Sequence, residues 1–133
     1  MLGGGMRQAG IIAAAGIIAL EKMTQRLPED HATARHIAAG LASIPGIVLN
    51  LADVQTNIVF VTFTHLSATD VSARLADRGI LASPSDGRRM RLVTHHQVSP
   101  ADAARVVIAV REICAEIVPA PVTASAAVPS SSA

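Results

Sequence analysis

Two arginine-containing segments of this 133-residue sequence have the residue types needed to bind a small anion. In the first, Arg7 follows Gly3, Gly4 and Gly5 and precedes an apolar stretch typical of a helix. The N–H groups of a glycine-rich loop and of a helix start, together with a guanidinium, can surround a phosphate. The stretch has no Gly-Lys-Ser/Thr, so it is not a nucleotide-binding P-loop. On its own it is more typical of a flexible leader.

The second segment, Arg88–His95, alternates basic and apolar residues with the period of a β-strand. This alternation predicts that Met90 and Leu92 pack against helices while Arg89 and Arg91 lie on the opposite face of the sheet. A guanidinium on that face could bind a carboxylate through two parallel hydrogen bonds. Exposed arginines are more often simply solvated, so the segment alone leaves both interpretations open.

The five histidines do not have the spacing of a metal site. His31 and His36 are five residues apart, which on a helix separates their directions by about 140°. His95 and His96 would face opposite sides of a strand, and His65 stands far from both pairs in the sequence. No nucleophile elbow accompanies the scattered serines, so a hydrolytic triad has no support either. We expect no metal ion and no triad in this chain.

Charge, hydropathy and cysteine content exclude several classes of protein. A net charge of +1 provides no strong field for nucleic acid or an anionic membrane. The longest apolar run, Gly10 to Leu20, is shorter than the roughly 20 residues of a membrane-spanning helix, and the start of the chain does not resemble a signal peptide. Cys114 has no possible internal disulfide partner and is expected to be a buried, inert thiol. We therefore expect a cytoplasmic protein.

The elements that must position the arginines begin with a helix over residues 8–25, whose early turns are apolar on every side. Such a helix needs burial on every side, so we expect it to pack against another domain or subunit. A second helix should begin at Pro28, with Glu29 and Asp30 near its positive dipole end. Its expected core stripe is Ala34, Ile37, Ala38 and Leu41, and its expected end is Gly40 with Ile44–Gly46.

A strand is predicted at Asn57–Thr64, because this run is rich in β-branched and aromatic residues. Both of its faces are apolar, which is typical of a strand covered on two sides. We expect the face with Val59, Val61 and Phe63 to be the one that the helices of this chain leave exposed. A missing partner would then cover it.

The remaining elements complete a prediction of an α+β fold. The expected elements are a third helix capped by Ser67 or Thr69 and running through Ala76, a strand at Ile80–Ala82, a turn at Ser83–Gly87, a return strand at Met90–Thr94, and a fourth helix from Ser99-Pro100 to about Val118. Together they predict a small, mostly antiparallel sheet with helices on one face, preceded by a long apolar helix. We expect residues 1–26 to form a Gly-rich loop and an interdomain or intersubunit helix, residues 27–118 a small domain, and residues 119–133 a disordered tail.

Several motifs of this chain resemble one family in their order. They are Leu2–Gly10 followed by Ile11–Leu20, Arg26–His31 with Ala34-Arg35, Thr56–Val59, and Arg91–His95 with Val98-Ser99. Up to about Val118 the sequence resembles the C-terminal third of the low-specificity L-threonine aldolases. The resemblance implies the small C-terminal domain of a pyridoxal phosphate enzyme of the aspartate aminotransferase fold type. Such enzymes cleave L-threonine and L-allo-threonine to glycine and acetaldehyde, usually as homotetramers.

The resemblance also implies roles for particular residues. Arg91 matches the arginine that binds the substrate α-carboxylate, and Arg7 matches an arginine near the cofactor phosphate, offered across a subunit boundary. The lysine that holds the cofactor lies upstream in the family, whereas the single lysine here is Lys22, in the first helix. We therefore expect no catalytic residue in this chain, a missing N-terminal large domain, and an isolated chain without activity. The alternative is a non-enzymatic interaction module whose first helix binds another protein.

Overall fold

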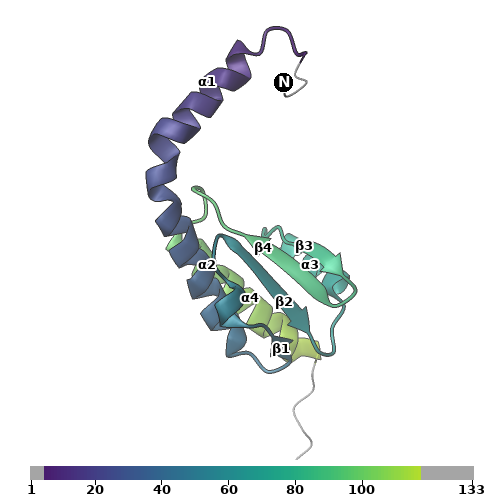
Figure 1. Ribbon diagram of the computed structural model, residues 1–133. Helices are drawn as coiled ribbons and strands as arrows, with labels where there is room; N and C mark the ends of the chain where they lie inside the picture. Colours follow the sequence, from purple (N-terminus) through teal and green to yellow (C-terminus); the bar gives the residue numbers. More distant parts are fainter. Residues whose placement is uncertain (1–4, 118–133) are drawn as a thin grey trace, which may run out of the picture.

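The computed structural model describes residues 5–117, which form four α-helices and one four-stranded sheet. The elements are α1 (Gly10–Ile18), α2 (Leu27–Ala42), β1 (Ile47–Val48), β2 (Ile58–Phe63), α3 (Ala68–Asp77), β3 (Ser83–Asp86), β4 (Arg89–Val93) and α4 (Pro100–Ile117). Figure 1 shows α2, α3 and α4 on one side of the sheet, with α1 extending away from it. The predicted α+β fold is confirmed. Val118 and the predicted tail, 119–133, lie outside the described residues.

The sheet is antiparallel throughout, in the order β1-β2-β4-β3. In the central pair, Val59 stands opposite Leu92 and Val61 opposite Met90. All four of these side chains are buried, so one face of the sheet forms the floor of the core. Because side chains alternate along a strand, this register sends every second residue of β2 and β4 to the other face.

The expectation for the faces of β2 was wrong. Val59, Val61 and Phe63 lie in the core under the helices, and the exposed face carries Ile58 and Phe60. The reason is the pairing with β4, which places Val59 and Val61 beside the inward-facing Met90 and Leu92 and so on the helix side. A strand that is apolar on both faces does not reveal by itself which face its neighbours cover.

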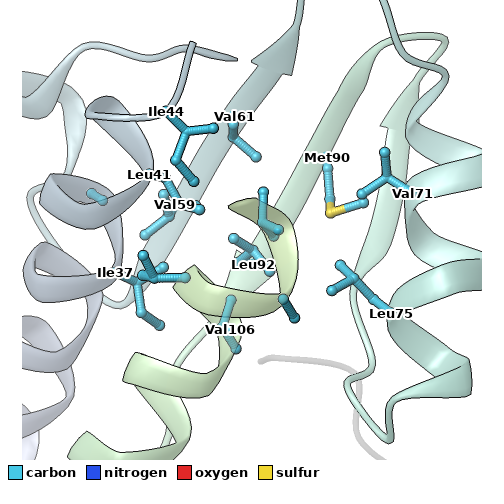
Figure 2. Packing of buried hydrophobic residues seen from close by; sticks show 14 of the residues in the cluster. Ile37, Leu41, Ile44, Val59, Val61, Val71, Leu75, Met90, Leu92 and Val106 are labelled. Carbon is cyan, nitrogen blue, oxygen red and sulfur yellow. The ribbon is translucent and has the colours of Figure 1, made fainter. Parts of the chain in front are cut away.

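Three helices supply the other half of the core. The predicted stripe of α2 is buried as expected and packs against α4, which in turn packs against α3 with its buried Val71 and Leu75. Figure 2 shows these side chains converging, with α4 lying between α2 and α3 above the strands. Burying one large apolar side chain in this core, for example Phe63 of β2, stabilises the fold by about 1.5–3 kcal/mol.

The predicted helix starts are confirmed by their caps. The Ser67 hydroxyl accepts a hydrogen bond from the Thr69 N–H at the start of α3. At the start of α4, the Ser99 hydroxyl accepts from the Asp102 N–H (3.1 Å), while the Ser99 N–H and hydroxyl both donate to the Asp102 carboxylate. These two hydrogen bonds from Ser99 hold the pKa of Asp102 below its usual value.

Gly40 does not end α2, because the helix continues to Ala42 and the chain reverses at Gly46, whose φ is +86°. Gly40 instead lies where α2 crosses α4. A Cβ at this position would lie 2.7 Å from Cγ2 of Val107. The glycine therefore permits a close approach of the two helices rather than a turn.

The region after α3 also differs from the prediction. Gly79, at φ +72°, follows α3 as expected, but Ile80–Ala82 is not a strand. The segment predicted as a turn, Ser83–Asp86, is the edge strand β3, and the reversal is confined to Gly87 and Arg88. Pro84 is compatible with this position because an edge strand leaves one row of N–H groups unpaired.

The first helix joins the second without a break in helical backbone. A π-helical turn (Ala19–Met23) and a 3-10 turn (Thr24–Arg26) connect α1 to α2. Pro28 has no N–H to donate to the Thr24 carbonyl, and the Leu27 N–H donates to that carbonyl instead, which accounts for the tight turn. All residues of α1 are exposed. None of the helices within residues 5–117 is long and apolar enough to cross a membrane.

We predict that Gly40→Ala destabilises the domain, although alanine usually favours a helix by about 0.5–1 kcal/mol over glycine. The new methyl group would overlap the stiff, β-branched Val107, and such overpacking costs about 1–3 kcal/mol. Urea denaturation should show a lower free energy of unfolding. In a Val107→Ala background the same change should be neutral or stabilising. A Gly40→Ala variant as stable as the parent would contradict the close packing.

Candidate functional site

The face of the sheet opposite the helices carries the arginines that the sequence singled out. From β2 it presents Ile58, Phe60 and Thr62, and from β4 it presents Arg89, Arg91 and Val93, all of them outside the buried core. The predicted alternation of Met90 and Leu92 inward with Arg89 and Arg91 outward is thus confirmed.

Arg91 stands in the interior of this face. Strand β4 is flanked by β2 and β3, so Arg91 has Phe60 opposite on one side and Ser83 opposite on the other. The side chain is exposed, and no ion pair within residues 5–117 includes it. A guanidinium with this setting can bind an external carboxylate through two parallel donors.

Arg89 is held differently from Arg91. Its guanidinium carbon lies 4.1 Å from the centre of the Phe60 ring, in a cation–π contact across the two strands. Both residues line a hollow of about 220 Å³ beside β1, which also includes Asn50 and Asp53. The alternation of β4 predicts Arg89 on this face but gives no sign of its contact with Phe60. The strand register, which no single segment reveals, brings them together.

Arg7 lies apart from these residues. It is exposed in the turn that precedes α1, next to Gln8, whose φ is +54°. Figure 1 shows this turn beyond the far end of α1, away from the sheet. The described chain therefore does not bring Arg7 and Arg91 into one site.

The single lysine of the sequence, Lys22, does not lie on the sheet face that carries Arg91. It is exposed in the π-helical turn between α1 and α2, and it does not line the hollow beside β1. Within residues 5–117 no group of three His, Cys, Asp or Glu side chains is arranged to hold a metal ion. Cys114 is buried, and burial raises the pKa of its thiol. The thiol is therefore a poor nucleophile at neutral pH.

A buried hydrogen-bond network ties the end of β4 to the start of α2. The Thr94 hydroxyl, in a side chain only 1% exposed, donates to the Asp30 carbonyl (2.7 Å). The Asn57 side chain donates to the Thr94 carbonyl (2.7 Å), and Arg26 donates to the Asp30 carboxylate. These bonds anchor the first turn of α2 to the sheet. Because α2 continues into α1, they also orient the helical backbone that carries Lys22 and leads to Arg7.

Comparisons with known proteins found a matching family model and similar enzymes. Residues 1–64 match the family model described as beta-eliminating lyase. The chain is 38% identical over 104 residues to low-specificity L-threonine aldolase 1 of Arabidopsis thaliana, a match that covers 76% of this chain and 29% of the relative. It is 40% identical over 106 residues to the low specificity L-threonine aldolase of Escherichia coli K12, covering 80% of this chain and 30% of the relative. The chain thus spans about 30% of the length of these relatives.

A solved structure of similar shape supports the fold. The structure of MppP soaked with the product 2-ketoarginine matches 73% of this chain and 30% of its own chain, with a TM-score of 0.57 and 17% sequence identity. At that identity the match concerns the fold alone.

We predict that Thr94→Val lowers the free energy of unfolding by about 0.5–1.5 kcal/mol, because the hydrogen bond from the buried Thr94 hydroxyl to the Asp30 carbonyl is lost while the side-chain shape is kept. Thr62→Val is the matched control, since Thr62 lies exposed on the same sheet and should change stability by less than about 0.5 kcal/mol. Thermal and urea unfolding of both variants measure the difference. An equal decrease in the free energy of unfolding for the two variants would mean that the buried Thr94 hydrogen bond does not contribute to stability.

Proposed function

We propose that this chain, whose residues 1–64 match the beta-eliminating lyases, is part of a pyridoxal phosphate-dependent threonine aldolase. In this role it supplies apparatus that binds the amino-acid substrate. The complete enzyme would cleave L-threonine or L-allo-threonine to glycine and acetaldehyde. The observation that carries the proposal is the position of Arg91, which is exposed on the interior strand β4 with no partner within residues 5–117. The identity to low-specificity L-threonine aldolases supports it.

We assign different roles to the two arginines within the proposed enzyme. Arg91 binds the α-carboxylate of the substrate and orients it on the sheet face. Arg7, at the end of the exposed helix, binds the cofactor phosphate at a subunit boundary. A guanidinium group has five N–H donors and no acceptor, so both arginines bind anions and neither serves as a base in the reaction. The reactive centre, including the lysine that holds the cofactor, therefore belongs to the rest of the enzyme.

The exposed apolar helix α1 supports a contact with another domain or subunit. The large side chains Ile11, Ile12, Ile17, Ile18 and Leu20 are all more than half exposed. We propose that residues 1–26 connect the small domain of residues 27–118 to an N-terminal large domain and to a second subunit of a cytoplasmic homo-oligomer. Burial of α1 in that assembly would remove these apolar side chains from water.

The same observation favours a second function, a protein-interaction module without enzymatic activity. An apolar helix that projects from a folded domain can bind a partner of any kind. The two functions differ in what the arginines do, since the interaction module requires neither Arg7 nor Arg91.

We predict that the isolated chain neither cleaves L-threonine nor holds pyridoxal phosphate at a defined lysine. Lys22 is exposed in the π-helical turn between α1 and α2, where solvent reaches its amine. The measurement is incubation with pyridoxal phosphate, reduction with borohydride and peptide mapping by mass spectrometry, alongside an acetaldehyde assay. A stoichiometric adduct at Lys22 together with threonine turnover would falsify the proposed role as a fragment.

We predict opposite effects for the two arginines in a chimera that carries residues 1–117 of this chain in place of the matching segment of the Escherichia coli enzyme. Arg91→Ala should lower kcat/KM for L-threonine about 30-fold or more, because a charged hydrogen-bonded pair is lost, with cofactor retention unchanged. Arg91→Lys should recover little, since an ammonium lacks the two parallel donors. Arg7→Ala should instead weaken retention of pyridoxal phosphate.

Cofactor titration and steady-state kinetics separate these effects. If Arg91→Ala releases cofactor and Arg7→Ala raises KM, the two assignments are interchanged. If the parent chimera is active and neither substitution matters, both arginines are merely solvated.

A further inference from the structure

We propose that Phe60 is a positioning residue for Arg91, and that Arg89 holds Phe60 in place. The three side chains would act as one unit on the exposed face of the sheet, with Arg89 against the ring of Phe60 and Arg91 opposite Phe60 in the strand register. This inference rests on the proposed function in so far as Arg91 binds a carboxylate. The positioning itself is a property of this chain and can be measured without a complete enzyme.

The hydrogen-bond pattern of the sheet brings Phe60 and Arg91 close together. The Phe63 N–H donates to the Arg88 carbonyl, and the Thr94 N–H donates to the Asn57 carbonyl. Hydrogen-bonded pairs recur at every second residue of an antiparallel ladder. The odd-numbered residues of β2 are therefore the ones that form hydrogen-bonded pairs with β4. Phe60 and Arg91 therefore form a non-hydrogen-bonded pair, the kind in which facing side chains approach most closely.

Arg89 fixes the ring from the neighbouring position. Its own partner across the strands is Thr62, yet its guanidinium lies 4.1 Å from the centre of the Phe60 ring, in a diagonal contact. Within residues 5–117 no ion pair draws Arg89 away from the ring. The cation–π contact thus restricts the rotamers of a phenylalanine that is 40% exposed.

A fixed ring benefits a carboxylate-binding arginine in two ways. An exposed arginine samples many rotamers, and binding requires that this freedom be lost. A ring beside the side chain removes part of that freedom before the substrate arrives. It also keeps water from one side of the guanidinium, which strengthens the pairing with a carboxylate.

The first experiment measures the motion of Arg91 in the full chain by nitrogen-15 relaxation of the arginine Nε–H groups. In the parent we expect a higher order parameter for Arg91 than for Arg7. Phe60→Ala should lower it towards the flexible range, below about 0.6, and Phe60→Tyr should preserve the parent value because the ring remains. Ile58→Ala is the matched control, an exposed apolar residue on the same face and strand, opposite Val93.

Phe60→Leu tests the aromatic contact separately from apolar bulk, and it should lower the order parameter of Arg91 while thermal unfolding shows an intact fold. Arg89→Met should do the same by releasing the ring. If the order parameter of Arg91 is the same in the parent chain and in the Phe60→Leu and Arg89→Met variants, the positioning role is overturned.

The second experiment uses the chimera described above and L-threonine as the substrate. Phe60→Leu should raise KM about three- to tenfold with kcat little changed, and Phe60→Tyr should restore KM. An inactive parent chimera, with the relaxation results as expected, would overturn the proposed function and leave the positioning of Arg91 established. An active chimera whose KM is unaffected by Phe60→Leu would overturn the positioning role.

Discussion

Burial of one face of the central strand pair determines the rest of this structure. Val59 and Val61 of β2 and Met90 and Leu92 of β4 lie under three helices, and their pairing leaves only one register for the two strands. A shift of β4 by one residue would expose Met90 and Leu92 and bury Arg89 and Arg91, which is far more costly than the loss of any contact on the outer face. The outward placement of Phe60, Arg89 and Arg91 is therefore a consequence of hydrophobic burial on the opposite face.

The helical layer depends on a second constraint, the close approach of α2 and α4 at Gly40. This approach allows the two longest helices to cover the sheet side by side, with α3 completing the layer. The buried hydroxyl of Thr94 then connects the last residue of the β4 region to the first turn of α2. Because α2 continues through Ala19–Met23 and Thr24–Arg26 into α1, this connection sets the direction of the exposed helix relative to the sheet face.

Arg7 and Arg91 lie too far apart in this chain to act in one site without other parts of the proposed enzyme. Arg91 lies on a rigid sheet, where its direction is determined by strand pairing, whereas Arg7 lies at the end of a projecting helix. A site that uses both must draw on other parts of an assembly, in keeping with a chain that spans about 30% of the length of its relatives. In the proposed assembly, the exposed apolar side chains of α1 would be buried against another domain or subunit.

The sequence by itself determined the helices, their caps and the alternation of β4. Pro28, Ser67 and Ser99 act through backbone groups within a few residues of themselves, and the inward Met90 and Leu92 follow from a period-two pattern. The exposed face of β2, the role of Gly40, the strand at Ser83–Asp86 and the contact between Arg89 and Phe60 depended on tertiary structure. Each of these is decided by a neighbour distant in sequence: β4 for the faces of β2, Val107 for Gly40, and the strand register for the cation–π pair. Local patterns report which groups need burial or a hydrogen-bond partner, but only the packed chain specifies which partner is present.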